Sequence, residues 1–120
     1  MKYMKMKVAF LDGARLHKAF LAGTRALEAR KEYLNSINVF PVPDGDTGDN
    51  MVLTLRHIAG NTLVSRSISR TCSSMAEAAL MGSRGNSGLI LAQYIYGLSR
   101  ALKENTTVGT LAFSESLVRA

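Results

Sequence analysis

The sequence has 120 residues, of which 47% are hydrophobic and 20% are charged, and its formal net charge is +6. This composition is typical of one globular domain and excludes an intrinsically disordered chain. With a single cysteine, Cys72, an internal disulfide is excluded and a structural zinc site is not expected, so we predict a reducing, cytoplasmic location. The apolar run Val8-Ala-Phe-Leu11 is too short for a signal peptide, and no transmembrane segment is predicted.

The excess of positive charge raises the question of a nucleic-acid partner. The lysines and arginines are scattered, however, with no basic run after Lys7 and no interleaved aromatic residues of the kind that bind single strands. We therefore predict no nucleic-acid partner and interpret most basic side chains as solvated helix faces.

The chain divides into a basic N-terminal lead, residues 1–11, and a helical domain, residues 12–120. Asp12 is a good helix N-cap, and the apolar residues after it recur at helical spacing, which predicts a long first helix to about Asn35. Gly23, in the middle of this helix, costs about 1 kcal/mol relative to alanine. It indicates either a close approach by another helix or a soft joint.

A second helix is predicted to start where Asp49 or Asn50 can serve as the N-cap, and to fade near Gly60. The polar connector after this helix contains Arg66 and Arg70. Each of the two arginines is either solvent-facing or functional.

Three further helices are predicted. The pattern Ser74-Met-Ala-Glu77 fits a capping box and opens a third helix, which ends at Gly82. A fourth helix, from Leu89 to about Glu104, is apolar on most of its circumference and is therefore expected at the centre of the packing. Thr110 is predicted to cap a last helix. Because no segment shows strand alternation, the predicted fold class is all-α.

An acidic motif lies between the first two helices, at residues 38–50. It places three carboxylates, Asp44, Asp46 and Asp49, within six residues on a backbone bent by two prolines and two glycines. An ordinary turn needs no such run of acids, whereas Mg²⁺ takes one or two protein carboxylates together with water and phosphate oxygens. A calcium loop is excluded, because counting from Asp44 its glycine position falls on Asp49 and its final glutamate position on Leu55.

A second motif, Gly82-Ser-Arg-Gly-Asn-Ser-Gly88, has glycines at every third position directly before the predicted fourth helix. Glycines let backbone N–H groups approach an anion closely, and the Ser87 hydroxyl adds a donor. Arg84 either pairs with a phosphate or lies on the surface. The motif is neither a P-loop nor a dinucleotide fingerprint, so its meaning depends on its pairing with the acidic motif.

Leu34-Asn35, the acidic motif and the glycine motif together resemble the N-terminal kinase domain of the bacterial fatty acid kinase ATP-binding subunit. That domain is similar to the nucleotide-binding L subunit of dihydroxyacetone kinase. The resemblance implies an antiparallel all-helical barrel, with Mg²⁺ on the acidic motif and nucleotide phosphates on the glycine motif. The chain is shorter than that domain and stops within a helical pattern at Val118-Arg-Ala120, so we expect an incomplete barrel.

The resemblance also assigns residues. Asp44 and Asp46 are implied as catalytic residues and Mg²⁺ ligands, with Asn38 and Asp49 as further metal ligands and Asn35 as an alternative to Asn38. Asp49 stands where the family usually has a small uncharged residue, often Thr, so a helix cap is its alternative role. The residues implied in binding ATP phosphates are Thr47, Ser83, Gly85, Asn86, Ser87 and Gly88.

The function implied is Mg-ATP-dependent phosphoryl transfer to a fatty acid carboxylate, presented by a separate fatty-acid-binding protein, to give an acyl phosphate. A kinase similar to dihydroxyacetone kinase is one alternative. Another is a non-catalytic metal- and nucleotide-binding or interaction module, inactive on its own. We also expect a homo-oligomer, because an incomplete barrel leaves apolar faces of the fourth and last helices in water.

Overall fold

The computed structural model describes residues 9–39 and 43–120. This part of the chain folds into six helices: α1 (Gly13–Ala29), α2 (Lys31–Ser36), α3 (Thr47–Asn61), α4 (Ile68–Gly82), α5 (Gly85–Ala101) and α6 (Thr110–Arg119). Two short strands, β1 (Phe10–Leu11) and β2 (Val108–Gly109), pair antiparallel. The predicted all-α fold class is confirmed, and the strand pair, which shows no alternation in the sequence, ties the start of α1 to the start of α6.

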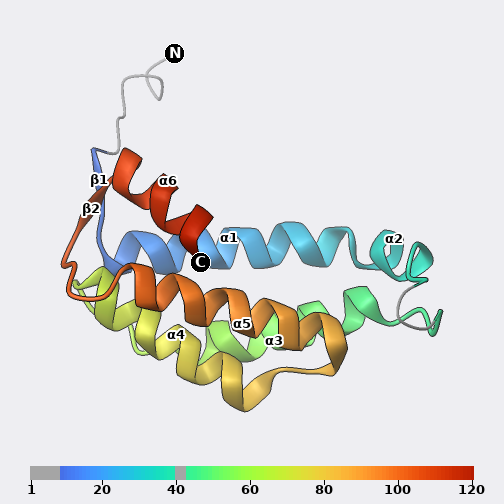
Figure 1. Ribbon diagram of the computed structural model, residues 1–120. Coiled ribbons are helices and arrows are strands. Elements are labelled where there is room, and N and C mark those ends of the chain that lie inside the picture. The colour runs from blue at the N-terminus through green and yellow to red at the C-terminus, as the bar shows by residue number, and fades with distance from the viewer. Residues whose placement is uncertain (1–8, 40–42) are drawn as a thin grey trace.

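Helices α3, α4 and α5 pack against one another, and α1 lies along α3 and α4 (Figure 1). The start of α3 and the start of α5 lie toward one end of this bundle, whereas the strand pair lies at the other end (Figure 1). None of the helices in the described ranges is long and apolar enough to cross a membrane.

The predicted first helix is two helices. Arg30, with φ −110° and ψ 11°, ends α1 and precedes α2, so the prediction of one helix to Asn35 is wrong. The break lets α2 lie against the first turn of α3, where a Cβ on Gly48 would clash with the carbonyl oxygen of Lys31. At Gly23, by contrast, α1 is unbroken and a Cβ would meet no atom within 4 Å, so no other helix approaches closely there.

The predicted third helix starts earlier than its capping-box pattern indicates. Helix α4 begins at Ile68, and the hydroxyl of its N-cap, Ser67, accepts a hydrogen bond from the Arg70 N–H. Ser74 lies inside the helix and accepts from the Leu63 N–H at 2.8 Å, so it is not a cap. The start of α4 is stabilised by a residue outside this helix, because the Ile68 N–H donates to the Thr106 carbonyl.

The core is centred on α4 rather than on the predicted fourth helix. Helix α4 buries apolar side chains along its length, including Ile68, Cys72 and Met75, and its alanines let neighbouring helices approach closely. Helix α5 buries only one face and leaves Ile90 70% exposed. Burial raises the pKa of the Cys72 thiol to about 12, which agrees with a structural rather than a nucleophilic cysteine.

Candidate functional site

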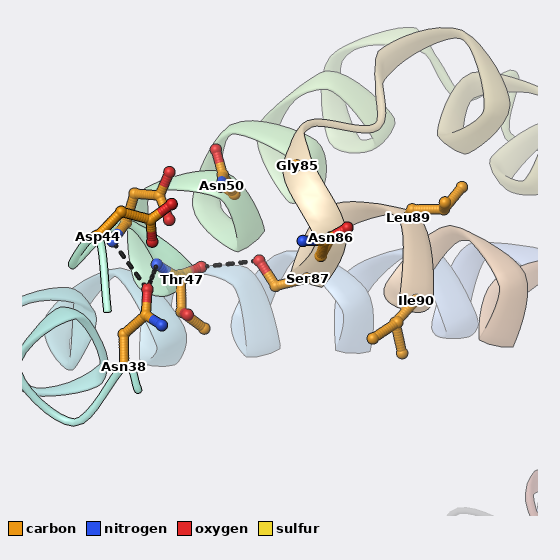
Figure 2. A pocket seen from close by; sticks show the side chains of 10 residues that line it. Asn38, Asp44, Thr47, Asn50, Gly85, Asn86, Ser87, Leu89 and Ile90 are labelled. Atoms are coloured by element: carbon orange, nitrogen blue, oxygen red, sulfur yellow. Dashed lines mark hydrogen bonds between the residues drawn. The ribbon is translucent and has the colours of Figure 1, made fainter. Parts of the chain in front are cut away.

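A cavity of about 590 Å³ lies at the end of the bundle where the acidic and glycine motifs meet (Figure 2). It joins residues from the α2–α3 connection, the first turn of α3 and the first turns of α5. The lining residues are Asn38, Asp44, Asp46, Thr47, Asn50, Gly85, Asn86, Ser87, Leu89 and Ile90. The two motifs that are distant in the sequence therefore form two walls of one cavity. Pro41, counted among the bends of the acidic motif, lies outside the described residues.

The first turn of α3 is capped by Asn38 rather than by its own N-cap residue. Asp46 occupies the N-cap position but its side chain makes no capping hydrogen bond. Instead, the Asn38 Oδ1 atom accepts from the Asp46 N–H at 3.0 Å and from the Thr47 N–H at 3.1 Å (Figure 2). Because these helix-end donors are satisfied by Asn38, the Asp46 carboxylate does not have to turn back onto its own helix. Asn38, predicted as a metal ligand, thus has its amide oxygen directed at backbone.

Asp44 and Asp46 are close enough to influence each other. Gly45 between them has a φ of +70°, a conformation that favours glycine and turns the chain sharply. A hydrogen bond with the Asp46 side chain raises the pKa of Asp44 above its ordinary value of 3.8, and desolvation and the Asp46 charge act in the same direction. The negative charge of Asp44 is therefore disfavoured beside Asp46, and a bound cation would offset this effect.

The donor set suits a magnesium ion carried with phosphates. Among the described residues, no group of three or more His, Cys, Asp or Glu side chains is arranged to hold a metal. Two carboxylates, Asp44 and Asp46, line the cavity. Mg²⁺ is bound in many phosphate-handling proteins by one or two carboxylates, with water and phosphate oxygens completing its octahedron. The residues present therefore fit such an ion.

Asp49 does not line the cavity. It exchanges two hydrogen bonds with Asn35: the Asn35 Nδ2 atom donates to its carboxylate, and its own N–H donates to the Asn35 Oδ1 atom, both at 3.1 Å. The Lys31 ammonium lies 3.7 Å from the same carboxylate. Both predicted ligands, Asp49 and Asn35, are thus engaged with each other, and they hold α2 against α3.

The glycine motif has a different local structure from the loop that we predicted. Helix α5 begins at Gly85, so Asn86, Ser87 and Gly88 belong to its first turn. The Gly85 φ is +65°, and a Cβ there would clash with the Asn50 side chain. A Cβ on the buried Gly88 would clash with the Thr54 hydroxyl. These glycines let α5 rest directly on α3, and Gly88, predicted to contact phosphate, faces α3 instead of the cavity.

The other residues predicted in the glycine motif divide in the same way. Ser83 follows the last residue of α4 and does not line the cavity. Asn86 and Ser87 do line it, in the first turn of α5, where backbone N–H groups lack helical partners and the helix dipole favours an anion. The Ser87 hydroxyl donates to the Thr47 carbonyl at 3.0 Å and so links the two walls (Figure 2).

Three lining residues were not predicted as site residues: Asn50, Leu89 and Ile90. Asn50 follows Asp46 by four residues, so a helix that starts at Thr47 places both on one face, and the correct helix start would have revealed it. Leu89 and Ile90 follow the glycine motif directly and form an apolar side of the cavity, farther along α5 from Asp44 (Figure 2).

Comparison with known proteins identifies the family of the chain. Residues 41–120 match the model of the DAK2 domain. The chain belongs to the DAK2 domain family. In dihydroxyacetone kinases the DAK2 domain binds nucleotide, as Mg-ADP. The predicted similarity to the dihydroxyacetone kinase L subunit is confirmed at this level.

The relatives of this DAK2 domain are longer proteins. It is 38% identical over 112 residues to an uncharacterized protein of Staphylococcus saprophyticus, a match that covers 91% of this chain and 20% of that protein. It is 36% identical over 114 residues to Protein YloV of Bacillus subtilis, covering 93% of this chain and 21% of YloV. An uncharacterized protein of Staphylococcus epidermidis is 35% identical over 112 residues, with 91% and 20% covered. The chain thus spans about a fifth of the length of these relatives.

Proposed function

We propose that this DAK2 domain binds Mg²⁺ and ATP in the cavity at the end of the bundle and takes part in phosphoryl transfer. The observation that carries the proposal is that one cavity of about 590 Å³ holds both Asp44 and Asp46 and the first turn of α5. Carboxylates attract a cation, whereas a helix N-terminus attracts an anion. A magnesium ion bound together with nucleotide phosphates would satisfy both.

The residues of the chain have separate roles in this proposal. Asp44 and Asp46 would hold the metal ion, which when bound would neutralise charge on the phosphates. The Asn86 and Ser87 backbone N–H groups donate to phosphate oxygens, and the Thr47 side chain at the cavity wall adds a polar contact. No protein nucleophile is needed, since phosphoryl transfer depends mainly on positioning and on stabilisation of charge in the transition state.

For the phosphate acceptor, we propose a fatty acid presented by a separate fatty-acid-binding protein. A carboxylate oxygen of the acid would attack the γ-phosphorus of ATP, the bond to the bridging oxygen would break, and an acyl phosphate and ADP would form. This acceptor is supported by the resemblance of the two motifs to the fatty acid kinase domain. A small hydroxylated acceptor, as in dihydroxyacetone kinases, is the alternative within the same family.

A second candidate function is binding of Mg²⁺ and nucleotide without turnover. It is favoured by the exposed apolar side chains on α5 and α6, among them Leu111 at 72% and Val118 at 84% exposure, which suit an interaction surface. Under this alternative the domain would bind nucleotide and require a partner, or further parts of a longer protein, for catalysis.

Calorimetry with ATP in Mg²⁺ and in EDTA tests the binding step. We expect binding that depends on Mg²⁺ and is lost in Asp44→Asn and Asp46→Asn. Asp49→Asn is the matched control, because it removes a carboxylate from the same turn that does not line the cavity. Equal binding in all three variants would contradict the site. Binding without acyl phosphate formation, when acyl acceptors and a fatty-acid-binding protein are supplied, would favour the second candidate.

A further inference from the structure

Thr54, a residue of α3 that does not line the cavity, joins the two helices that form its walls. Its side chain is fully buried, with 0% exposure. The Thr54 hydroxyl donates to the Asn50 carbonyl at 2.8 Å and accepts from the Arg84 N–H at 3.0 Å. Arg84 is the N-cap residue of α5, so this one hydroxyl connects the interior of α3 to the start of α5.

Thr54 also belongs to a row of polar residues that leads to the acidic motif. Asp46, Asn50 and Thr54 recur every four residues and therefore follow one face of α3. The start of α5 lies across this row: a Cβ on Gly85 would meet Asn50, and a Cβ on Gly88 would meet Thr54. The close contact of α5 with α3 thus depends on what occupies position 54.

Another polar link between the two walls joins residues that are more exposed to water than Thr54. The Ser87 hydroxyl donates to the Thr47 carbonyl, but Ser87 and Thr47 are only partly buried, so water competes for this bond. The Thr54 hydroxyl is shielded from water, and without it the Arg84 N–H would lose the partner that the structure gives it. Because this hydrogen bond is partly buried, its loss costs more than the loss of a fully exposed one.

We propose that Thr54 is a positioning residue that sets the distance between the carboxylates of Asp44 and Asp46 and the phosphate-binding turn of α5. This inference rests on the proposed function, because the distance matters when one Mg²⁺–nucleotide complex must contact both walls. Replacement of the hydroxyl by a methyl group, in Thr54→Val, keeps the volume but removes both hydrogen bonds. Thr54→Ser keeps the hydroxyl and removes the methyl group.

Thr71 provides a matched control. It is also fully buried, and its hydroxyl also bridges two backbone groups, since it donates to the Ser65 carbonyl and accepts from the Ser65 N–H, both at 2.9 Å. Ser65 precedes α4, and neither residue lines the cavity. Thr71→Val therefore imposes a similar loss of buried hydrogen bonds at a place that does not join the walls.

The test measures the magnesium enhancement, defined as the dissociation constant of ATP in EDTA divided by that in saturating Mg²⁺. Calorimetry is performed at a temperature where circular dichroism shows every variant to be folded. We expect Thr54→Val to reduce the enhancement by about tenfold or more, whereas Thr54→Ser and Thr71→Val keep it within about twofold. An unchanged enhancement in Thr54→Val, or an equal loss in Thr71→Val, overturns the positioning role.

A second measurement separates this inference from the proposed function. Hydrogen exchange of the Arg84 amide, measured without nucleotide, should be faster in Thr54→Val and unchanged in Thr71→Val. Unchanged exchange in Thr54→Val overturns the inference whether or not nucleotide binds. Absence of any magnesium enhancement in the wild-type chain overturns the proposed function instead.

Discussion

The capping of α3 by Asn38 predicts a measurable loss of stability in Asn38→Ala, even without metal. This substitution removes the acceptor of two backbone N–H groups, those of Asp46 and Thr47, at 3.0 and 3.1 Å. Loss of a helix cap typically costs about 1 kcal/mol, and two donors are affected here, so we expect about 1–2 kcal/mol. For a domain of this size the melting temperature should fall by roughly 3–8 °C.

Thermal unfolding in EDTA, together with amide exchange, measures this effect. Asn38→Asp keeps an acceptor oxygen and should restore most of the lost stability. Asn61→Ala is the control, because it removes only an exposed side-chain hydrogen bond at the other end of α3 and should change stability by less than about 0.5 kcal/mol. The capping argument would be refuted if Asn38→Ala left both the melting temperature and the hydrogen exchange rates of the Asp46 and Thr47 amides unchanged. That outcome is expected if Asn38 acts only as a metal ligand, because the measurements are made in EDTA.

Three other predictions concern separate parts of the molecule. Because the pKa of Asp44 is raised in the fold, its contribution to stability is present below the unfolded value of 3.8 and is lost as pH rises through the folded pKa. In Asp46→Asn, carbon-detected NMR titration should find a lower Asp44 pKa; an unchanged value would refute the coupling. Gly23→Ala should raise the free energy of unfolding by up to about 1 kcal/mol in denaturant titration, since its Cβ meets no atom within 4 Å, and destabilisation would contradict the open space at this position. We also expect self-association through the exposed faces of α5 and α6. Sedimentation at micromolar concentration should show a dimer or larger species, and the double substitution Leu111→Glu and Val118→Glu should dissociate it. A stable wild-type monomer would exclude this self-association.

The glycine motif shows that glycine spacing alone does not identify what approaches the backbone. Its spacing predicts close backbone approach, and the structure has such an approach, but at Gly88 the neighbour is Thr54 of α3. We therefore expect Gly88→Val to damage the fold as well as any nucleotide binding, rather than binding alone. A periodic glycine pattern indicates that another group lies close to the backbone. Only the packing of the helices shows whether that group belongs to a ligand or to a neighbouring helix.

Residue types and local order were sufficient to predict the helical class and the two motifs that face each other across the cavity. Helical periodicity, the absence of strand alternation and the carboxylates around Gly45 are all properties of neighbouring residues, so they can be read from the chain alone. The end of the helix at Gly82 was predicted for the same reason.

Contacts between distant residues decided the rest. The start of α4 at Ile68 depends on the Thr106 carbonyl, and the break at Arg30 accompanies the packing of α2 on α3. Asp49 has the same side chain as Asp46, yet it pairs with Asn35, because the position of each residue at the start of α3 determines which side its carboxylate faces. Local preferences differ by a few tenths of a kcal/mol to about 1 kcal/mol, and the burial of helix faces outweighs them. Which carboxylates line the cavity is therefore a property of the tertiary structure.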